Sequence, residues 1–174
     1  MKSEVKLENP MRKIKIEKVL LSAGATGDDL VKAKKLLELV SGKKAQITCA
    51  GPNTRIPEFD VRPGMELGTR VTLRDGEAIE LLKRLLSAID NELKKKQLAD
   101  NHFSFGIKEY IEIPGIEYQR DLGIRGFNIT VVFIRAGARV KLKKIKRGKV
   151  PKKQIISKSE IENYMTEVFK TKFK

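Results

Sequence analysis

The sequence predicts an α+β fold in which one antiparallel sheet carries its helices on a single face. Segments that alternate apolar and polar residues at period two indicate strands, and two segments with one apolar stripe each indicate helices. These segments follow one another in the order β-α-β-β-α-β-β. Because each helix has only one side to bury, both can pack on the same face of the sheet. The predicted layout is a split β-α-β, ferredoxin-like arrangement followed by a basic C-terminal extension.

The first strand and helix follow Pro10. The run RKIKIEKVLLSAG alternates at first and then becomes continuously apolar, as a strand entering a sheet core does. Asp28 or Asp29 can then cap a helix, and Gly42 is a natural residue to end it. The helix between them repeats apolar side chains at helical spacing, namely Leu30, Ala33, Leu37 and Val40.

The next two strands enclose a long loop. Their polar residues are Gln46, Thr48, Arg70, Thr72 and Arg74, which alternate with Ile47, Cys49, Val71 and Leu73. Successive side chains of a strand point to opposite faces, so we expect each strand to have one apolar and one polar face. Three prolines between the strands rule out continuous pairing through the loop.

The second helix and the last two strands complete the predicted core. Asp75 is expected to cap the helix, whose apolar stripe is Ala78, Leu82, Leu85 and Ile89. The strands lie on either side of an irregular region at residues 109–126. Their inward residues are expected to be Phe103, Phe105, Ile107, Phe127, Ile129, Val131 and Phe133.

The face opposite the helices is predicted to be polar. Its hydroxyl, amide and guanidinium groups belong to Thr48, Arg70, Thr72, Arg74, Ser104, Asn128 and Thr130. None of these residues is acidic, so the face suits the phosphates and 2′-hydroxyls of RNA, as in sheets of the RNA-recognition-motif type. The alternative is an ordinary solvated sheet face.

The charge of the chain indicates the same class of partner. The 174 residues have a net charge of +15, and a surplus this large favours a polyanion, more often nucleic acid than an anionic membrane. We expect a domain at residues 1–138, with a net charge of +5, and a basic extension at residues 139–174, with a net charge of +10. Residues 139–153 hold nine basic side chains and no acidic one, and part of this stretch is expected to lie extended along an edge or groove. A capping box at Ser157 and Glu160 opens a short terminal helix.

Several classes of protein are disfavoured by what the sequence lacks. The polar start MKSEVKLENPMRK has no apolar signal core, no run is long enough to span a membrane, and the single Cys49 allows no internal disulfide. Phosphate-binding, zinc-protease, redox and nucleophile-elbow motifs do not occur. His102, the only histidine, has no obvious nucleophile near it in sequence. We therefore expect no catalytic residues, no metal site and no cofactor.

Four separated segments resemble, in the right order, those of a known family. They are NPMRKIKIEKVLLSAG, FDVRPGMELGTRVTLR, SFGIKEYIEIPGIEY and GIRGFNITVV, and with the basic tail they cover nearly the whole chain. The chain resembles the number-five family of large-subunit ribosomal proteins, which bind 5S rRNA, in its archaeal and eukaryotic branch. The resemblance implies a place in the central protuberance of cytoplasmic ribosomes. It also implies contacts with 5S rRNA, large-subunit rRNA, a neighbouring 5S-binding ribosomal protein, the elbow of P-site tRNA and a small-subunit protein across an intersubunit bridge.

The resemblance also implies individual site residues. Phe59 and Thr72 match positions that the family uses for 5S rRNA, whereas Ser22 stands where many members have Asn and Lys43 where many have Gln. With the polar face and the tail, the predicted rRNA-binding residues are Ser22, Lys43, Thr48, Phe59, Arg70, Thr72, Arg74, Arg139, Lys141, Lys143, Lys144, Lys146 and Arg147. The loop at residues 51–58 is expected to reach P-site tRNA or, alternatively, to pack on neighbouring rRNA. Its predicted contact residues are Asn53, Thr54, Arg55, Ile56 and Pro57.

We therefore expect a non-enzymatic, structural RNA-binding protein of the large ribosomal subunit. One alternative is a free module that binds tRNA or mRNA. Another is a small phosphate-ester or acyl-phosphate hydrolase on the same ferredoxin-like layout. No compact Arg-containing anion loop joined to a suitable Asn is evident, and a basic tail serves no small substrate.

Overall fold

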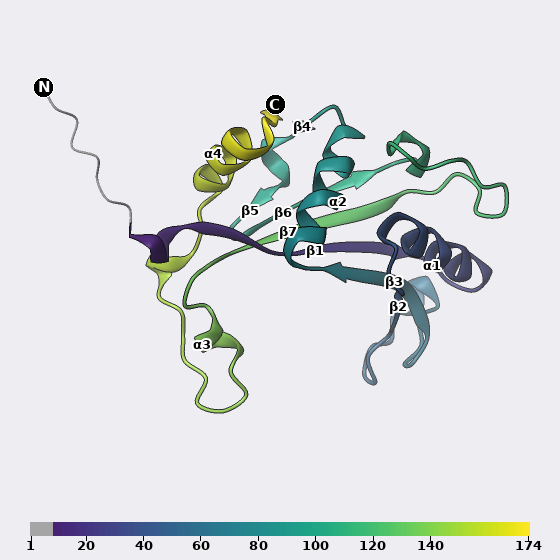
Figure 1. Cartoon of the computed structure of the whole chain (residues 1–174). Coiled ribbons are helices and arrows are strands. Elements are labelled where there is room, and N and C mark those ends of the chain that lie inside the picture. The colour runs from purple at the N-terminus through teal and green to yellow at the C-terminus, as the bar shows by residue number, and fades with distance from the viewer. Residues whose placement is uncertain (1–8) are drawn as a thin grey trace, which may run out of the picture.

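The fold is one antiparallel six-stranded sheet with its longer helices on one face (Figure 1). The computed structural model describes residues 9–174, so the polar start in which we expected no signal sequence lies largely outside the described residues. The strands of the sheet are β1 (Ile14–Gly24), β2 (Gln46–Cys49), β3 (Glu66–Leu73), β5 (Leu98–Ala99), β6 (His102–Ile107) and β7 (Phe127–Arg135). The α-helices are α1 (Asp28–Ser41), α2 (Asp75–Ser87), α3 (Arg139–Leu142) and α4 (Lys158–Phe169). Two further strands, β4 (Glu92–Leu93) and β8 (Lys172–Phe173), form a separate parallel pair.

The order of the strands confirms the predicted α+β class and its split β-α-β start. Across the sheet the order is β2-β3-β1-β7-β6-β5, so β3 lies between the two strands that α1 connects. Strand β6, which comes after α2 in the chain, does not pair with β1. Strand β7 lies between them and pairs with both. β1 and β7 therefore form the centre of the sheet, and both are antiparallel to their neighbours.

The core lies between the sheet and the helices. The inward residues predicted for β6 and β7 are all buried, as are the four predicted for α1. In α2 the stripe is buried at Ala78, Leu82 and Leu85, whereas Ile89 lies beyond the end of the helix and is only partly buried. Gly42 ends α1 as expected, because its backbone is left-handed, with φ 66°, and its N–H donates to the Glu38 carbonyl at 2.8 Å.

The predictions that an aspartate caps α1 and α2 are wrong. Gly27 occupies the N-cap of α1 and Arg74 that of α2, and neither makes a side-chain capping hydrogen bond. Asp28 and Asp75 are instead the first helical residues. Their carboxylates there still oppose the positive end of the helix dipole.

The predicted apolar side of β2 is not buried in the core. Ile47 is 37% exposed and Cys49 is exposed, because β2 is the edge strand and pairs only with β3. The buried side of this region is provided by β3 instead, through Val71 and Leu73.

The C-terminal segment has two parts. Residues 139–155 project from the end of β7, whereas residues 156–174 return to the core, where Ile156, Ile161 and Met165 are fully buried. The predicted capping box opens α4, and the Ser157 N–H donates to the Glu160 carboxylate at 3.0 Å. The last residues then run beside β4, with the Lys174 N–H donating to the Leu93 carbonyl.

Candidate RNA interface

The residues of the sheet face opposite the helices form rows across the strands that are mostly polar, because directly paired residues of neighbouring strands share a face. One row runs Gln46, Arg70, Ser22, Asn128 and Gly106, from β2 through β3, β1 and β7 to β6. The next row runs Thr72, Leu20, Thr130 and Ser104. We call this surface the polar face. It brings the predicted residues Ser22, Arg70 and Thr72 together, with Thr48 on the edge strand beside them.

The two arginines of the polar face differ in whether an acidic side chain lies near them. Arg70 and Thr72 are exposed, and Arg70 lies between Gln46 and Ser22. Arg74 lies 3.8 Å from the Glu17 carboxylate, which also lies 3.9 Å from Lys18. An acidic group therefore offsets part of the charge at the Arg74 end of the face, and Arg70 is the stronger candidate for a phosphate contact.

Two glycines let the backbone and side chains of the polar face approach closely. A Cβ at Gly68 would lie 2.7 Å from the Ala23 carbonyl oxygen, so β3 could not hold its distance from β1 with a larger residue there. A Cβ at Gly106 would lie 3.0 Å from the Asn128 side-chain oxygen. Gly106 therefore leaves room for the Asn128 amide to lie across β6.

The basic arm, residues 139–153, projects from the polar-face side of the sheet. It begins with the single helical turn of α3 and folds back, with the Gly148 N–H donating to the Val140 carbonyl at 3.2 Å. Its predicted contact residues, Arg139, Lys141, Lys143, Lys144, Lys146 and Arg147, are all exposed. Leu142 and Ile145 are also exposed, at 64% and 76%, so these two side chains are not part of the core.

The loop between β2 and β3 projects on the same side. It is stiffened by paired backbone hydrogen bonds of 3.1 Å between Ile56 and Val61 and by a 2.8 Å bond from Ala50 to Met65. The predicted tRNA-contact residues, Asn53, Thr54, Arg55, Ile56 and Pro57, are all exposed. We call residues 50–65 the projecting loop.

Phe59 does not lie on the polar face. It belongs to the 3-10 turn Pro57–Phe59 in the projecting loop and is 74% exposed. An aromatic ring presented this openly is available for stacking on a nucleotide base.

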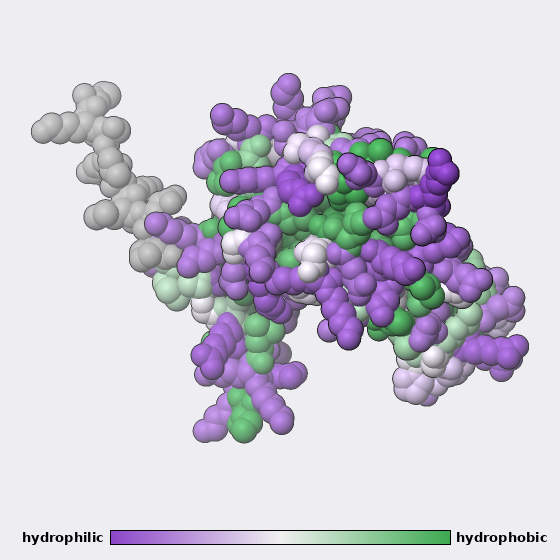
Figure 2. Space-filling model, turned by 45° about the vertical axis from the view of Figure 1, so that its right-hand side comes forward, coloured by the Kyte–Doolittle hydropathy of each residue, from purple (hydrophilic) through white to green (hydrophobic). Residues whose placement is uncertain are grey.

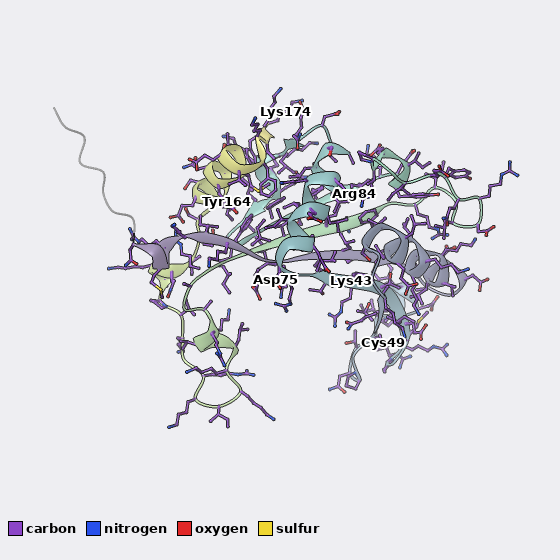
Figure 3. The ribbon with its side chains drawn as sticks, in the orientation of Figure 1. Lys43, Cys49, Asp75, Arg84, Tyr164 and Lys174 are labelled. Carbon is purple, nitrogen blue, oxygen red and sulfur yellow. The ribbon has the colours of Figure 1, made fainter. Side chains whose placement is uncertain are left out.

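Lys43 is likewise separate from the polar face. It follows α1, and its ammonium group forms an ion pair with Glu77 in the first turn of α2. Figure 3 shows it with Asp75 where α1 and α2 meet the sheet. Lys43 thus has an acidic partner on the helix layer.

The polar face, the basic arm and the projecting loop together form a saddle. In Figure 1 the arm and the loop descend from opposite ends of the sheet, while α1, α2 and α4 cover its other side. Figure 2 shows that the arm is mostly hydrophilic, with scattered hydrophobic residues. This geometry can hold a rod-shaped polyanion against the sheet with a contact at each end.

The structure also shows which residues line the hollows beside the predicted site. Ser104, Asn128 and Thr130, which the sequence placed on the polar face, line one shallow hollow with Ser22, and the structure adds Gln97 to it. Lys18 and Lys149 line a second hollow at the foot of the arm. The alternation of the strands placed the first three on the polar face, but Gln97, in a 3-10 turn, carries no such signal.

Other chemistry finds little support among residues 9–174. No group of three acidic, His or Cys side chains is placed to hold a metal ion, and no helix in this range is long and apolar enough to cross a membrane. The exposed His102 ring lies 3.1 Å from the Asp100 carbonyl, which is a local turn contact.

Comparison with known proteins shows one family. The model for the C-terminus of the ribosomal L5 protein family matches residues 66–161. A large ribosomal subunit protein uL5 from Nanoarchaeum equitans is 42% identical over 164 residues, covering 92% of this chain and 96% of that protein. The uL5 proteins of Nitrosopumilus maritimus and Sulfolobus acidocaldarius are 38% and 36% identical, covering 93% and 95% of this chain and 94% of each relative.

Proposed function

Since the chain belongs to the uL5 family of large ribosomal subunit proteins, we propose that its polar face binds 5S rRNA in the central protuberance. Members of this family are structural components of the ribosome and not enzymes. This argues against the alternative of a small phosphate-ester or acyl-phosphate hydrolase. The observation that supports the proposal most is the saddle, because it combines a hydroxyl- and amide-rich surface with two projections that carry cations.

The parts of the saddle have different proposed roles. Arg70 and the lysines of the basic arm neutralise phosphates, which gives affinity without sequence choice. The hydroxyl and amide groups of the polar face contact riboses and bases, and these contacts distinguish one RNA from another. The arm reaches large-subunit rRNA, since its seven cations between residues 139 and 149 have no acidic residue among them.

The projecting loop has a separate proposed role in contacting the elbow of P-site tRNA. Its backbone is shaped by the Ile56–Val61 hydrogen bonds, and Arg55 is exposed near its tip. Arg55 is the only cation of residues 51–58, and one exposed cation makes only a modest phosphate contact, which suits a tRNA that must move on. The same end of the protein is proposed to contribute to the bridge with the small subunit and to lie near the neighbouring 5S-binding protein.

Competition binding tests the proposal. The full-length protein is titrated with labelled 5S rRNA from the same organism, and unlabelled tRNA and 5S rRNA are added as competitors at physiological salt. We expect 5S rRNA to compete at least roughly tenfold better than tRNA. Equal competition by both RNAs would support the free RNA-binding module instead.

A further inference from the structure

Two hollows on this side of the protein differ in their chemistry. The hollow at the foot of the arm, of about 580 Å³, is lined by several charged residues, among them Lys18, Arg135 and Lys141. The hollow on the polar face, of about 370 Å³, is lined by uncharged residues only among those the structure describes. These are Ser22, Gln97, Ser104, Phe105, Gly106, Asn128 and Thr130. The second hollow therefore lacks the groups that neutralise phosphate.

Asn128 lies at the centre of the uncharged hollow. It is paired directly with Ser22 on one side and with Gly106 on the other. The missing side chain at Gly106 leaves space for the amide, whose oxygen would lie 3.0 Å from a Cβ at that position. Asn128 is exposed, so its amide presents a carbonyl acceptor and two N–H donors to whatever occupies the hollow.

These groups match the edge of a nucleobase better than a phosphate. An amide both donates and accepts, as the edge of adenine does, and Asn is one of the residues that pairs with adenine through two hydrogen bonds. Proteins read RNA sequence mostly on unpaired bases, whose edges are free. Arg70 lies two strands away in the same row, roughly 10 Å at the usual strand spacing, where it can hold the backbone of the same segment.

We propose that the hollow centred on Asn128 binds the edge of an unpaired adenine in 5S rRNA. This inference rests on the proposed function and makes Asn128 a residue that determines specificity. Arg70 and the basic arm then supply affinity for any RNA, whereas Asn128 supplies preference for one.

Affinity measured at several salt concentrations separates these two roles. For Asn128→Ala we expect 5S rRNA to bind roughly tenfold more weakly at every salt concentration, with an unchanged log–log salt slope, because no phosphate contact is lost. The affinity for competitor tRNA should not change. Asn163→Ala is the matched control, since Asn163 is an exposed residue of α4 on the helix layer. Thermal melting establishes that both variants are folded.

Chemical footprinting identifies the base. Dimethyl sulfate reports on N1 and diethyl pyrocarbonate on N7 of adenines, and both are applied to 5S rRNA saturated with protein. One adenine protected by the wild-type protein and by Asn163→Ala should become reactive with Asn128→Ala. Unchanged protection of every base, or release of a base other than adenine, would overturn the inference.

The outcomes also separate this inference from the proposed function. If the wild-type protein shows no preference for 5S rRNA over tRNA, the proposed function fails and the inference with it. If the preference exists but Asn128→Ala retains it, only the inference fails. If Asn128→Ala binds RNA with wild-type affinity but enters large subunits poorly, the hollow contacts a neighbouring protein and not RNA. That outcome also contradicts the inference.

Discussion

Arg135, in β7, donates a hydrogen bond of 2.6 Å from its guanidinium to the carboxylate of Glu160, in α4. The Arg135 side chain is 8% exposed, and a second guanidinium nitrogen contacts the Lys153 carbonyl at 3.3 Å. Arg135 therefore fixes both the end of the basic arm and the start of the terminal helix. The C-terminal end of the arm is therefore held against the end of β7.

Glu160→Gln should destabilise the protein. The substitution removes the charge that compensates a buried guanidinium, and a hydrogen bond between charged groups contributes about 1.5–3 kcal/mol. We expect a loss of roughly 2 kcal/mol in the free energy of unfolding, measured by urea denaturation at neutral pH. The matched control is Glu162→Gln in the same helix. The Glu162 carboxylate lies 3.0 Å from the ammonium group of Lys95, whose side chain is 62% exposed. That change should cost about 0.5 kcal/mol or less, and equal losses in the two variants would contradict the role given to Arg135.

The stability contributed by Glu160 should depend on pH. Burial raises the pKa of Glu160, but hydrogen bonds from the Ser157 backbone and from Arg135 outweigh it, so this pKa lies below its ordinary value of 4.5. The unfolded chain then binds more protons in the window below that value, and stability rises with pH across it. The difference in unfolding free energy between wild type and Glu160→Gln should be full above about pH 5 and shrink as the pH falls through the folded pKa. A difference that stays constant down to pH ~3 would show that the carboxylate is not stabilised by folding.

The basic arm should determine much of the salt dependence of RNA binding. The triple variant Lys143→Gln, Lys144→Gln, Lys146→Gln spares Arg147, whose side chain holds the turn through a 2.8 Å bond to the Lys143 carbonyl. Each phosphate contact contributes about 0.7–0.9 to the log–log slope, so the slope should fall by roughly 2. The control removes the same charge from the helix layer at the exposed Lys32, Lys35 and Lys83. Equal slopes in the arm variant and the wild type would show that the arm touches no phosphate.

The tip of the projecting loop should affect tRNA more than assembly. Replacing Asn53, Thr54 and Arg55 by Gly-Ser-Gly removes the exposed polar tip and leaves the Ile56–Val61 hydrogen bonds in place. Ribosomes carrying this variant should contain 5S rRNA in normal amounts and lose P-site tRNA several-fold faster, as measured by filter retention of labelled tRNA. Loss of 5S rRNA without a change in tRNA retention would move the role of the loop to assembly.

Local sequence patterns predicted the elements of this fold well, because their causes are local. The spacing of Leu30, Ala33, Leu37 and Val40 in α1 and the alternation in β6 and β7 follow from which side of each element is buried. The capping box at Ser157 and the stop at Gly42 likewise depend on residues a few positions apart.

Features that depend on residues far apart in the chain could not be predicted from the sequence. Three ion pairs join separate elements and cannot be predicted from a local pattern. They are Arg135 with Glu160, Arg74 with Glu17 and Lys43 with Glu77. The exposure of Ile47 follows from the position of β2 at the edge of the sheet, which alternation alone does not reveal. For the site, the sequence indicated the polar face, but only the strand register brings Ser22, Arg70 and Asn128 into one row.

The most direct test of the central claim is the 5S rRNA affinity of Arg70→Ala and Thr72→Ala, two exposed changes on the polar face. The controls are Lys83→Ala in α2 and Thr166→Ala in α4, which make comparable changes on the exposed helix layer. Filter binding at physiological salt should show each polar-face variant weakened by about 1–3 kcal/mol and both controls unchanged. Wild-type affinity in both polar-face variants would contradict the claim that this face binds 5S rRNA.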